Sequence, residues 1–136
     1  MNSTLRILFI VHALVTFAAA VVLIAAPAAI PGAVDIKMGQ DQFLLCYFLG
    51  AAELAIAYLS FQSRKITDAK ALRIIVISFI IFHTATGLLE AFGATQGISP
   101  KIIANIVLRI LIVSLLYYFG LHRYSNNPNK QNSSAQ

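Results

Sequence analysis

The stretch from Leu44 to Phe61 is the feature that most constrains the fold. Its residues, LLCYFLGAAELAIAYLSF, are apolar almost throughout and long enough to cross a lipid bilayer as one helix. Glu53, near the centre, is the one charged side chain in it. A charge at that depth costs roughly 3 kcal/mol or more unless another group compensates it. The stretch therefore predicts a membrane helix whose interior needs a second polar group.

The rest of the chain is equally apolar. Hydrophobic residues make up 59% of it and charged residues 11%, against about a quarter charged in soluble domains, so lipid must be the solvent for most of the surface. A helix needs roughly 20 residues to cross a hydrocarbon core of ~30 Å. Apolar stretches of about that length recur along the chain. We expect four transmembrane helices, over about 5–26, 43–61, 72–92 and 101–121.

Short second and third connections make sequence neighbours antiparallel. The predicted fold is an all-α integral membrane bundle of four helices in up-down-up-down order, formed by residues 1–121. Residues 122–136 are rich in Asn, Ser and Gln, which predicts a disordered cytoplasmic tail.

The first apolar stretch has a second interpretation, because Arg6 and the small residues of 26–28 resemble a signal peptide and its cleavage site. Signal peptides usually have an apolar core of about 7–15 residues. The first stretch is longer, so we expect a retained helix.

The connection from Pro27 to Gln42 is the longest of the three. Pro27 and Pro31 end the first helix. Apolar and charged residues alternate irregularly after them. This pattern suits a segment that lies on the membrane surface and folds over the mouth of the bundle, and it suits an ordinary surface loop equally well.

Basic residues near helix ends predict the orientation, since they favour the cytoplasmic side. The connection between the second and third helices has four such residues, Arg64, Lys65, Lys70 and Arg73. The two connections on the opposite side have only Lys37 and Lys101. Both termini are therefore predicted to be cytoplasmic.

Several kinds of site are excluded by composition. Cys46 is the one cysteine, so a single chain has neither a disulfide, a Cys-x-x-Cys redox motif nor a zinc-thiolate site. No metal site is predicted. Basic and aromatic residues do not interleave as they do in nucleic-acid-binding proteins, so no nucleic-acid partner is expected.

Polar residues within the spans form the candidate site. At ~1.5 Å per residue, Glu53 and His83 lie near the midplane, Arg109 lies roughly 10 Å below the outer face, and Asn105 and Glu90 lie nearer that face. One outward-opening polar interior would then contain Glu53, His83, Glu90, Asn105 and Arg109. Arg109 is long enough to reach either Glu53 or Glu90, and we expect Glu53 to be its main partner.

Two interpretations of this polar interior remain open. Buried polar side chains often serve only to fix helix order and register, and Glu90 can also turn outward to the membrane surface. Intramembrane charges are also frequent ligand or proton sites. Haem held between His12 and His83 is disfavoured, because the depth count places His12 several Å from the level of His83.

Residues of the second helix resemble the DoxX-like families of small bacterial four-helix membrane proteins. The resemblance rests on 49–54, the run Leu-Gly-Ala-Ala-Glu-Leu, followed by Leu59 and Arg64. It implies a four-helix bundle in a bacterial-type inner (plasma) membrane, with Glu53 as the position of interest, and in some members a link to quinone-dependent oxidation. The first helix has Arg6 but lacks the glycines and final lysine of that pattern. Sterol-isomerase-like membrane proteins are similar in outline, not in motif.

Three functions follow as hypotheses. The first is a membrane protein that binds a small amphipathic or lipid-like molecule, with Arg109 and Asn105 orienting its polar group. The second is a quinone-linked redox subunit in which Glu53 and His83 exchange protons with quinone. The third is a structural or accessory protein, as a homo-oligomer or a subunit of a membrane complex. The residues do not decide whether the protein is an enzyme.

Overall fold

The computed structural model describes residues 3–123, which contain helices and no strand. Four segments are long and apolar enough to span a membrane, which confirms the all-α prediction. They are α1 (Ser3–Ala25), α3 (Phe43–Ser63), α4 (Ala69–Thr95), and α5 (Ile102–Leu116) with its π-helical continuation η2 (Tyr117–His122). Two short elements precede α3, namely α2 (Ala29–Ala33) and the 3₁₀ turn η1 (Gln40–Gln42). The predicted disordered tail falls largely at 124–136, outside the described residues.

Local sequence accounts for the helix ends. The helix α1 ends at Ala25, before Pro27, because a proline inside a helix removes a backbone hydrogen bond and crowds the preceding turn. Asp68 caps α4, since its Oδ1 accepts a hydrogen bond from the backbone N–H of Ala71 at 2.6 Å.

The outer surface of the helices is apolar. Leu45 is 64% exposed and Leu89 is 68% exposed, and large aliphatic and aromatic residues on every long helix are similarly uncovered. A surface of this kind is unfavourable in water and favourable against lipid tails. It therefore supports the assignment of the long helices as membrane spans.

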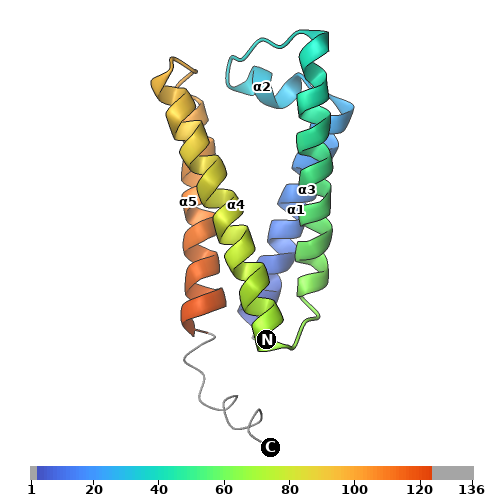
Figure 1. Ribbon diagram of the computed structural model, residues 1–136, viewed down its shortest axis with the longest axis vertical. Coiled ribbons are helices and arrows are strands. Elements are labelled where there is room, and N and C mark those ends of the chain that lie inside the picture. Colours follow the sequence, from blue (N-terminus) through green and yellow to red (C-terminus); the bar gives the residue numbers. More distant parts are fainter. Residues whose placement is uncertain (1–2, 124–136) are drawn as a thin grey trace, which may run out of the picture.

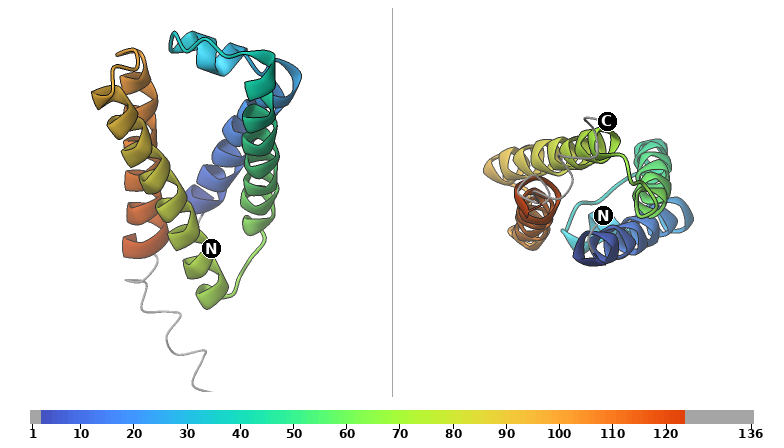
Figure 2. Two further views of the ribbon diagram at one scale, coloured as in Figure 1. Left: turned by 45° about the horizontal axis from the view of Figure 1, so that its top comes forward. Right: turned by 90° about the horizontal axis from the view of Figure 1, so that it is seen from below.

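The four long helices form two pairs. The most extensive contacts join α1 to α3 and α4 to α5. In Figure 1 the two pairs approach each other at the end where the N-terminus lies and separate toward the end where α2 lies. Figure 2, seen from below, shows α1 with α3 on one side and α4 with α5 on the other. The core cluster at the closed end joins both pairs and consists of Leu5, Phe9, Leu72, Val76, Phe79 and Leu116.

A stripe of small residues on α3 allows close packing against α1. Cys46, Gly50 and Ala57 are buried on this stripe. A Cβ atom added at Gly50 would lie 2.8 Å from Ile24 Cγ1 and 3.3 Å from the carbonyl oxygen of Ala20. The absence of a side chain at Gly50 therefore sets the approach of the two helices.

The connection from Pro27 to Gln42 reaches from the α1–α3 pair to the other pair. The Asp35 carboxylate accepts hydrogen bonds from Lys101 Nζ and Ser99 Oγ, each at 2.8 Å. These two residues lie at the start of α5, so this connection is fastened across the end where the pairs separate (Figure 1). Of the two predicted roles, a segment folded over the mouth fits this contact.

Candidate functional site

Glu90 on α4 and Arg109 on α5 form a partly buried ion pair. Nε and Nη2 of Arg109 each lie 2.9 Å from Glu90 Oε1. Asn105, one turn from Arg109, donates to the same oxygen at 2.7 Å. The other oxygen, Glu90 Oε2, is buried without a hydrogen-bond partner among residues 3–123. Glu90 therefore turns inward, and one of its two oxygens receives every donor.

The expected pairing of Arg109 with Glu53 is corrected by this geometry. Arg109 pairs with Glu90, the alternative partner that the length of its side chain also allowed. The physical reason is the grouping of the helices. Glu90 lies on the helix packed directly against α5, whereas Glu53 lies on α3, in the opposite pair.

Two histidines continue the polar cluster toward α1. Arg109 Nη1 lies 3.4 Å from His83 Nδ1, and His83 Nε2 lies 2.7 Å from His12 Nε2. His12 Nδ1 then lies 2.9 Å from Ser60 Oγ, which donates its proton to the carbonyl oxygen of Phe9 at 3.0 Å. The result is a chain of hydrogen bonds that runs from α5 through α4 and α1 to α3. We call it the polar chain.

The polar chain fixes the tautomer of each histidine. The single proton of Ser60 goes to Phe9, so Ser60 Oγ must accept a proton from His12 Nδ1. Neutral His12 then has a bare Nε2, which accepts from His83 Nε2–H. Neutral His83 has a bare Nδ1, which faces the donor Arg109. Every bond of the chain is satisfied with both rings neutral, because a second proton between the two Nε2 atoms would place two donors face to face.

The contact between His12 and His83 corrects the depth estimate. Counting along upright helices places the two residues at depths that differ by several Å, which separates them. In the structure their ring centroids are 5.0 Å apart and their Nε2 atoms are hydrogen-bonded. The helices of the two pairs lean toward one another at the closed end, which brings different levels together (Figure 1). A metal ion between two nitrogens needs them roughly 4 Å apart, so these rings, as placed, do not fit a haem iron between them.

Glu53 differs from the two histidines of the polar chain, because it has no bonded partner among residues 3–123. It is 8% exposed, and within the described part of the chain its carboxylate makes no hydrogen bond or ion pair. The charge of Arg109 still acts on it electrostatically across the space between the helix pairs. The fold therefore buries one carboxylate that it does not satisfy.

Sequence reasoning did not place His12 or Ser60 in the site. A signal was present on each helix. His12 lies between Phe9 and Thr16 on one face of α1, and all three are buried. Ser60 lies two turns beyond Glu53 on the same stripe of α3. Predicted members His83, Glu90, Asn105 and Arg109 are brought together, whereas Glu53 lies beside the cluster without bonding to it.

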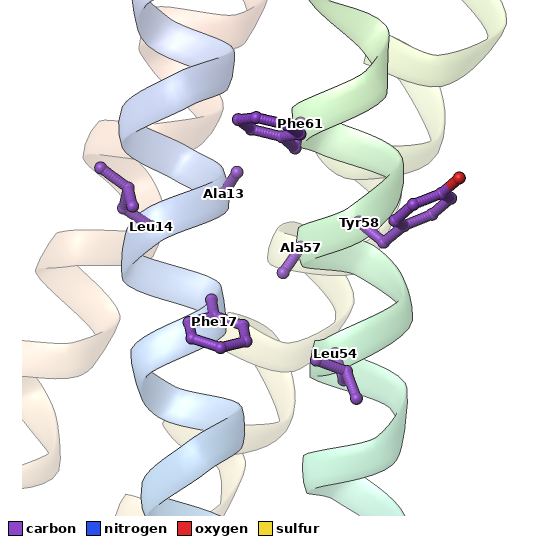
Figure 3. A pocket seen from close by; sticks show the side chains of 7 residues that line it. All are labelled: Ala13, Leu14, Phe17, Leu54, Ala57, Tyr58 and Phe61. Carbon is purple, nitrogen blue, oxygen red and sulfur yellow. The ribbon is translucent and has the colours of Figure 1, made fainter.

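An apolar cavity of about 260 Å³ lies between α1 and α3. Figure 3 shows that it has Ala13 and Ala57 at its centre and larger side chains around them. The lining residues are Ala13, Leu14, Phe17, Leu54, Ala57, Tyr58 and Phe61. Leu54 and Ala57 lie within one turn of Glu53 along α3, but Glu53 itself is not among the lining residues.

Among residues 3–123, no three or more His, Cys, Asp or Glu side chains lie together as they would in a metal site. No protein-family model, curated protein or solved structure matches the chain. The resemblance of 49–54 to the DoxX-like families stays a prediction.

Proposed function

We propose that this chain is a small multi-pass membrane protein that binds an amphipathic or lipid-like molecule along α3. The polar end of that molecule lies at Glu53, and its apolar part lies along α3. Four membrane-length helices and an outer surface of aliphatic side chains support the membrane assignment. Basic residues of 64–73 support an orientation with both termini cytoplasmic, and the resemblance of 49–54 supports a bacterial-type inner membrane.

The observation that carries this proposal is the unsatisfied carboxylate of Glu53. Residues that only lock helices together are expected to satisfy one another, as His12, His83 and Ser60 do. Glu53 is also buried, at 8% exposed, and has no such bond among the described residues. A buried polar group without a partner costs free energy, and a bound polar group supplies the missing partner.

The apolar cavity gives the rest of the molecule a place. It lies between α1 and α3, with lining residues within one turn of Glu53 along α3, and its lining consists of alkyl and aromatic side chains. Sites for small ligands commonly combine such a lining with a few polar groups that fix orientation. Glu53 and the cavity supply both parts on one helix.

A quinone-linked redox subunit is the second candidate, and the polar chain favours it. Two histidines with one proton between them can accept a proton at one end and release one at the other. In this alternative the polar chain exchanges protons with quinone oxygens. A partner subunit of the same membrane complex supplies or takes the electrons.

Native mass spectrometry of the gently extracted protein tests the proposal. We expect a small amphipathic molecule retained on the wild-type chain and on Asp41→Asn, which removes an exposed carboxylate of the connection before α3. Glu53→Leu is expected to lose it. A chain that carries no adduct in any variant contradicts binding. An adduct with the mass and ultraviolet spectrum of a quinone supports the second candidate instead.

A further inference from the structure

Each donor atom of the polar cluster already has one acceptor. Arg109 directs Nε and Nη2 to Glu90 and Nη1 to His83, and the amide of Asn105 donates to Glu90. The protons of His83, His12 and Ser60 are used along the polar chain. The carboxylate oxygens without a hydrogen bond among the described residues are those of Glu53 on one helix pair and Oε2 of Glu90 on the other.

The charges around Glu53 lead to the same conclusion. The titratable groups in the interior of the other three long helices are His12 on α1, His83 and Glu90 on α4, and Arg109 on α5. Glu90 and Arg109 neutralise each other, and both histidines are neutral in the bonding pattern of the chain. Ionised Glu53 therefore leaves one uncompensated negative charge within the span, which is unfavourable unless a proton or a cation neutralises it.

We propose that the bound molecule is a lipophilic cation whose positive head group pairs with Glu53. This inference rests on the proposed function and adds the class of ligand. An anionic head group would be repelled by ionised Glu53 and by the unbonded oxygen of Glu90, so the site selects against it. A cationic head satisfies Glu53, and an apolar body suits the cavity formed by residues of α1 and α3.

A proton competes with the cation for Glu53, because the unoccupied carboxylate is neutralised by protonation. Lower pH fills the site with protons, and protonation of His12 or His83 adds further positive charge nearby. Binding of a permanently charged cation is therefore expected to weaken as the solution becomes more acidic and to strengthen as it becomes alkaline.

Equilibrium dialysis of the full chain in dodecylmaltoside micelles tests this inference with tetraphenylphosphonium as the probe. Tetraphenylborate has the same shape and the opposite charge and serves as the matched ligand control. We expect the wild-type chain to bind tetraphenylphosphonium and not tetraphenylborate. Glu53→Gln keeps the shape of the side chain, removes its charge and is expected to weaken binding about 30-fold or more. Glu53→Asp restores part of the affinity, and Asp41→Asn leaves it unchanged.

Three results overturn the inference. These are equal binding by wild type and Glu53→Gln, wild-type affinity that does not fall in acid, and preference for tetraphenylborate. The last two need only the wild-type chain, so they hold even where Glu53→Gln does not fold. If tetraphenylborate is preferred and Arg109→Gln abolishes its binding, the ligand is anionic, so this inference fails while amphiphile binding stands. If neither probe binds and native mass spectrometry shows no adduct, both fail.

Discussion

His83 and His12 share one proton across 2.7 Å between their Nε2 atoms, and this hydrogen bond joins the two helix pairs. His83 lies on α4 and His12 on α1, and both are about 5% exposed or less. The rings also lie beside Phe79 of the core cluster at the closed end, where His12 and Phe79 have ring centroids 4.9 Å apart. The contact therefore combines a specific hydrogen bond with the apolar packing that holds the pairs together.

Removing both of these histidines is expected to cost less than the sum of the two single removals. His83→Leu leaves His12 Nε2 without a donor, and His12→Leu leaves the Nε2–H of His83 without an acceptor. A buried group that loses its partner costs about 1–3 kcal/mol. The free energies of unfolding, measured by circular dichroism in detergent with increasing denaturant, are expected to show a double variant less destabilised than the sum of the singles. Strict additivity would contradict the hydrogen bond.

Glu90 and Glu53 are expected to respond oppositely to the same substitution. Glu90→Leu strands the charge of Arg109 and is expected to destabilise the protein by about 3 kcal/mol or more. Glu53→Leu removes a carboxylate with no partner in the described structure and is expected to be neutral or stabilising. Denaturation of both variants under the same detergent conditions gives the comparison. A strong loss of stability in Glu53→Leu would show that Glu53 has a structural partner.

Packing of α1 against α3 is expected to depend on Gly50. Gly50→Val places methyl groups against Ile24 and the Ala20 carbonyl and is expected to cost about 1–3 kcal/mol through overpacking. Gly32→Val is the matched control, because no atom lies within 4 Å of a Cβ built there. Thermal unfolding followed by circular dichroism measures both. Equal effects at the two positions would mean that helix propensity decides the result.

The fastening of the 27–42 connection is expected to fail only in strong acid. Hydrogen bonds from Lys101 and Ser99 lower the pKa of Asp35 below its ordinary value of 3.8. A carboxylate with a lowered pKa stabilises the folded form above its unfolded pKa and loses that contribution as pH falls through the folded pKa. The contact should thus be intact at neutral pH and released in acid well below pH 3.8.

Spin labels at Val34 and Gln96, in a Cys46→Ser background, measure that contact as a distance. Asp35→Asn is expected to broaden and lengthen the distance at neutral pH, and Asp41→Asn is expected to leave it unchanged. A distance that changes near neutral pH in the parent chain would show that another group fastens the segment.

The sequence was sufficient for the features that depend on local order. Apolar length predicted the spans, and Pro27 and Pro31 predicted where the first helix ends. The choice of partner for Arg109 was not predictable in the same way. The partner of Arg109 depends on which helices pack together and on their tilt. The pattern of residues within a single helix contains no information on its packing partner or its tilt.

The histidines show the same limit. Depth counting treats each helix as upright, and it therefore separated His12 from His83, which are in contact. The role of Ser60 depends on the carbonyl of Phe9 in another helix, so no pattern within α3 indicates it. Glu53 was recognisable from its unusual position alone, yet its lack of a bond is visible only once its neighbours are placed.

The grouping of the helices into two pairs has a consequence for how the protein is made. The interface between α1 and α3 involves only residues up to Ser63, and the interface between α4 and α5 begins at Ala69. The first hairpin can therefore assemble in the membrane while the second is still being synthesised, and the histidine contact is made only when the two are joined. In this order of assembly, each hairpin forms from its own residues, and the docking of the two hairpins is the last step.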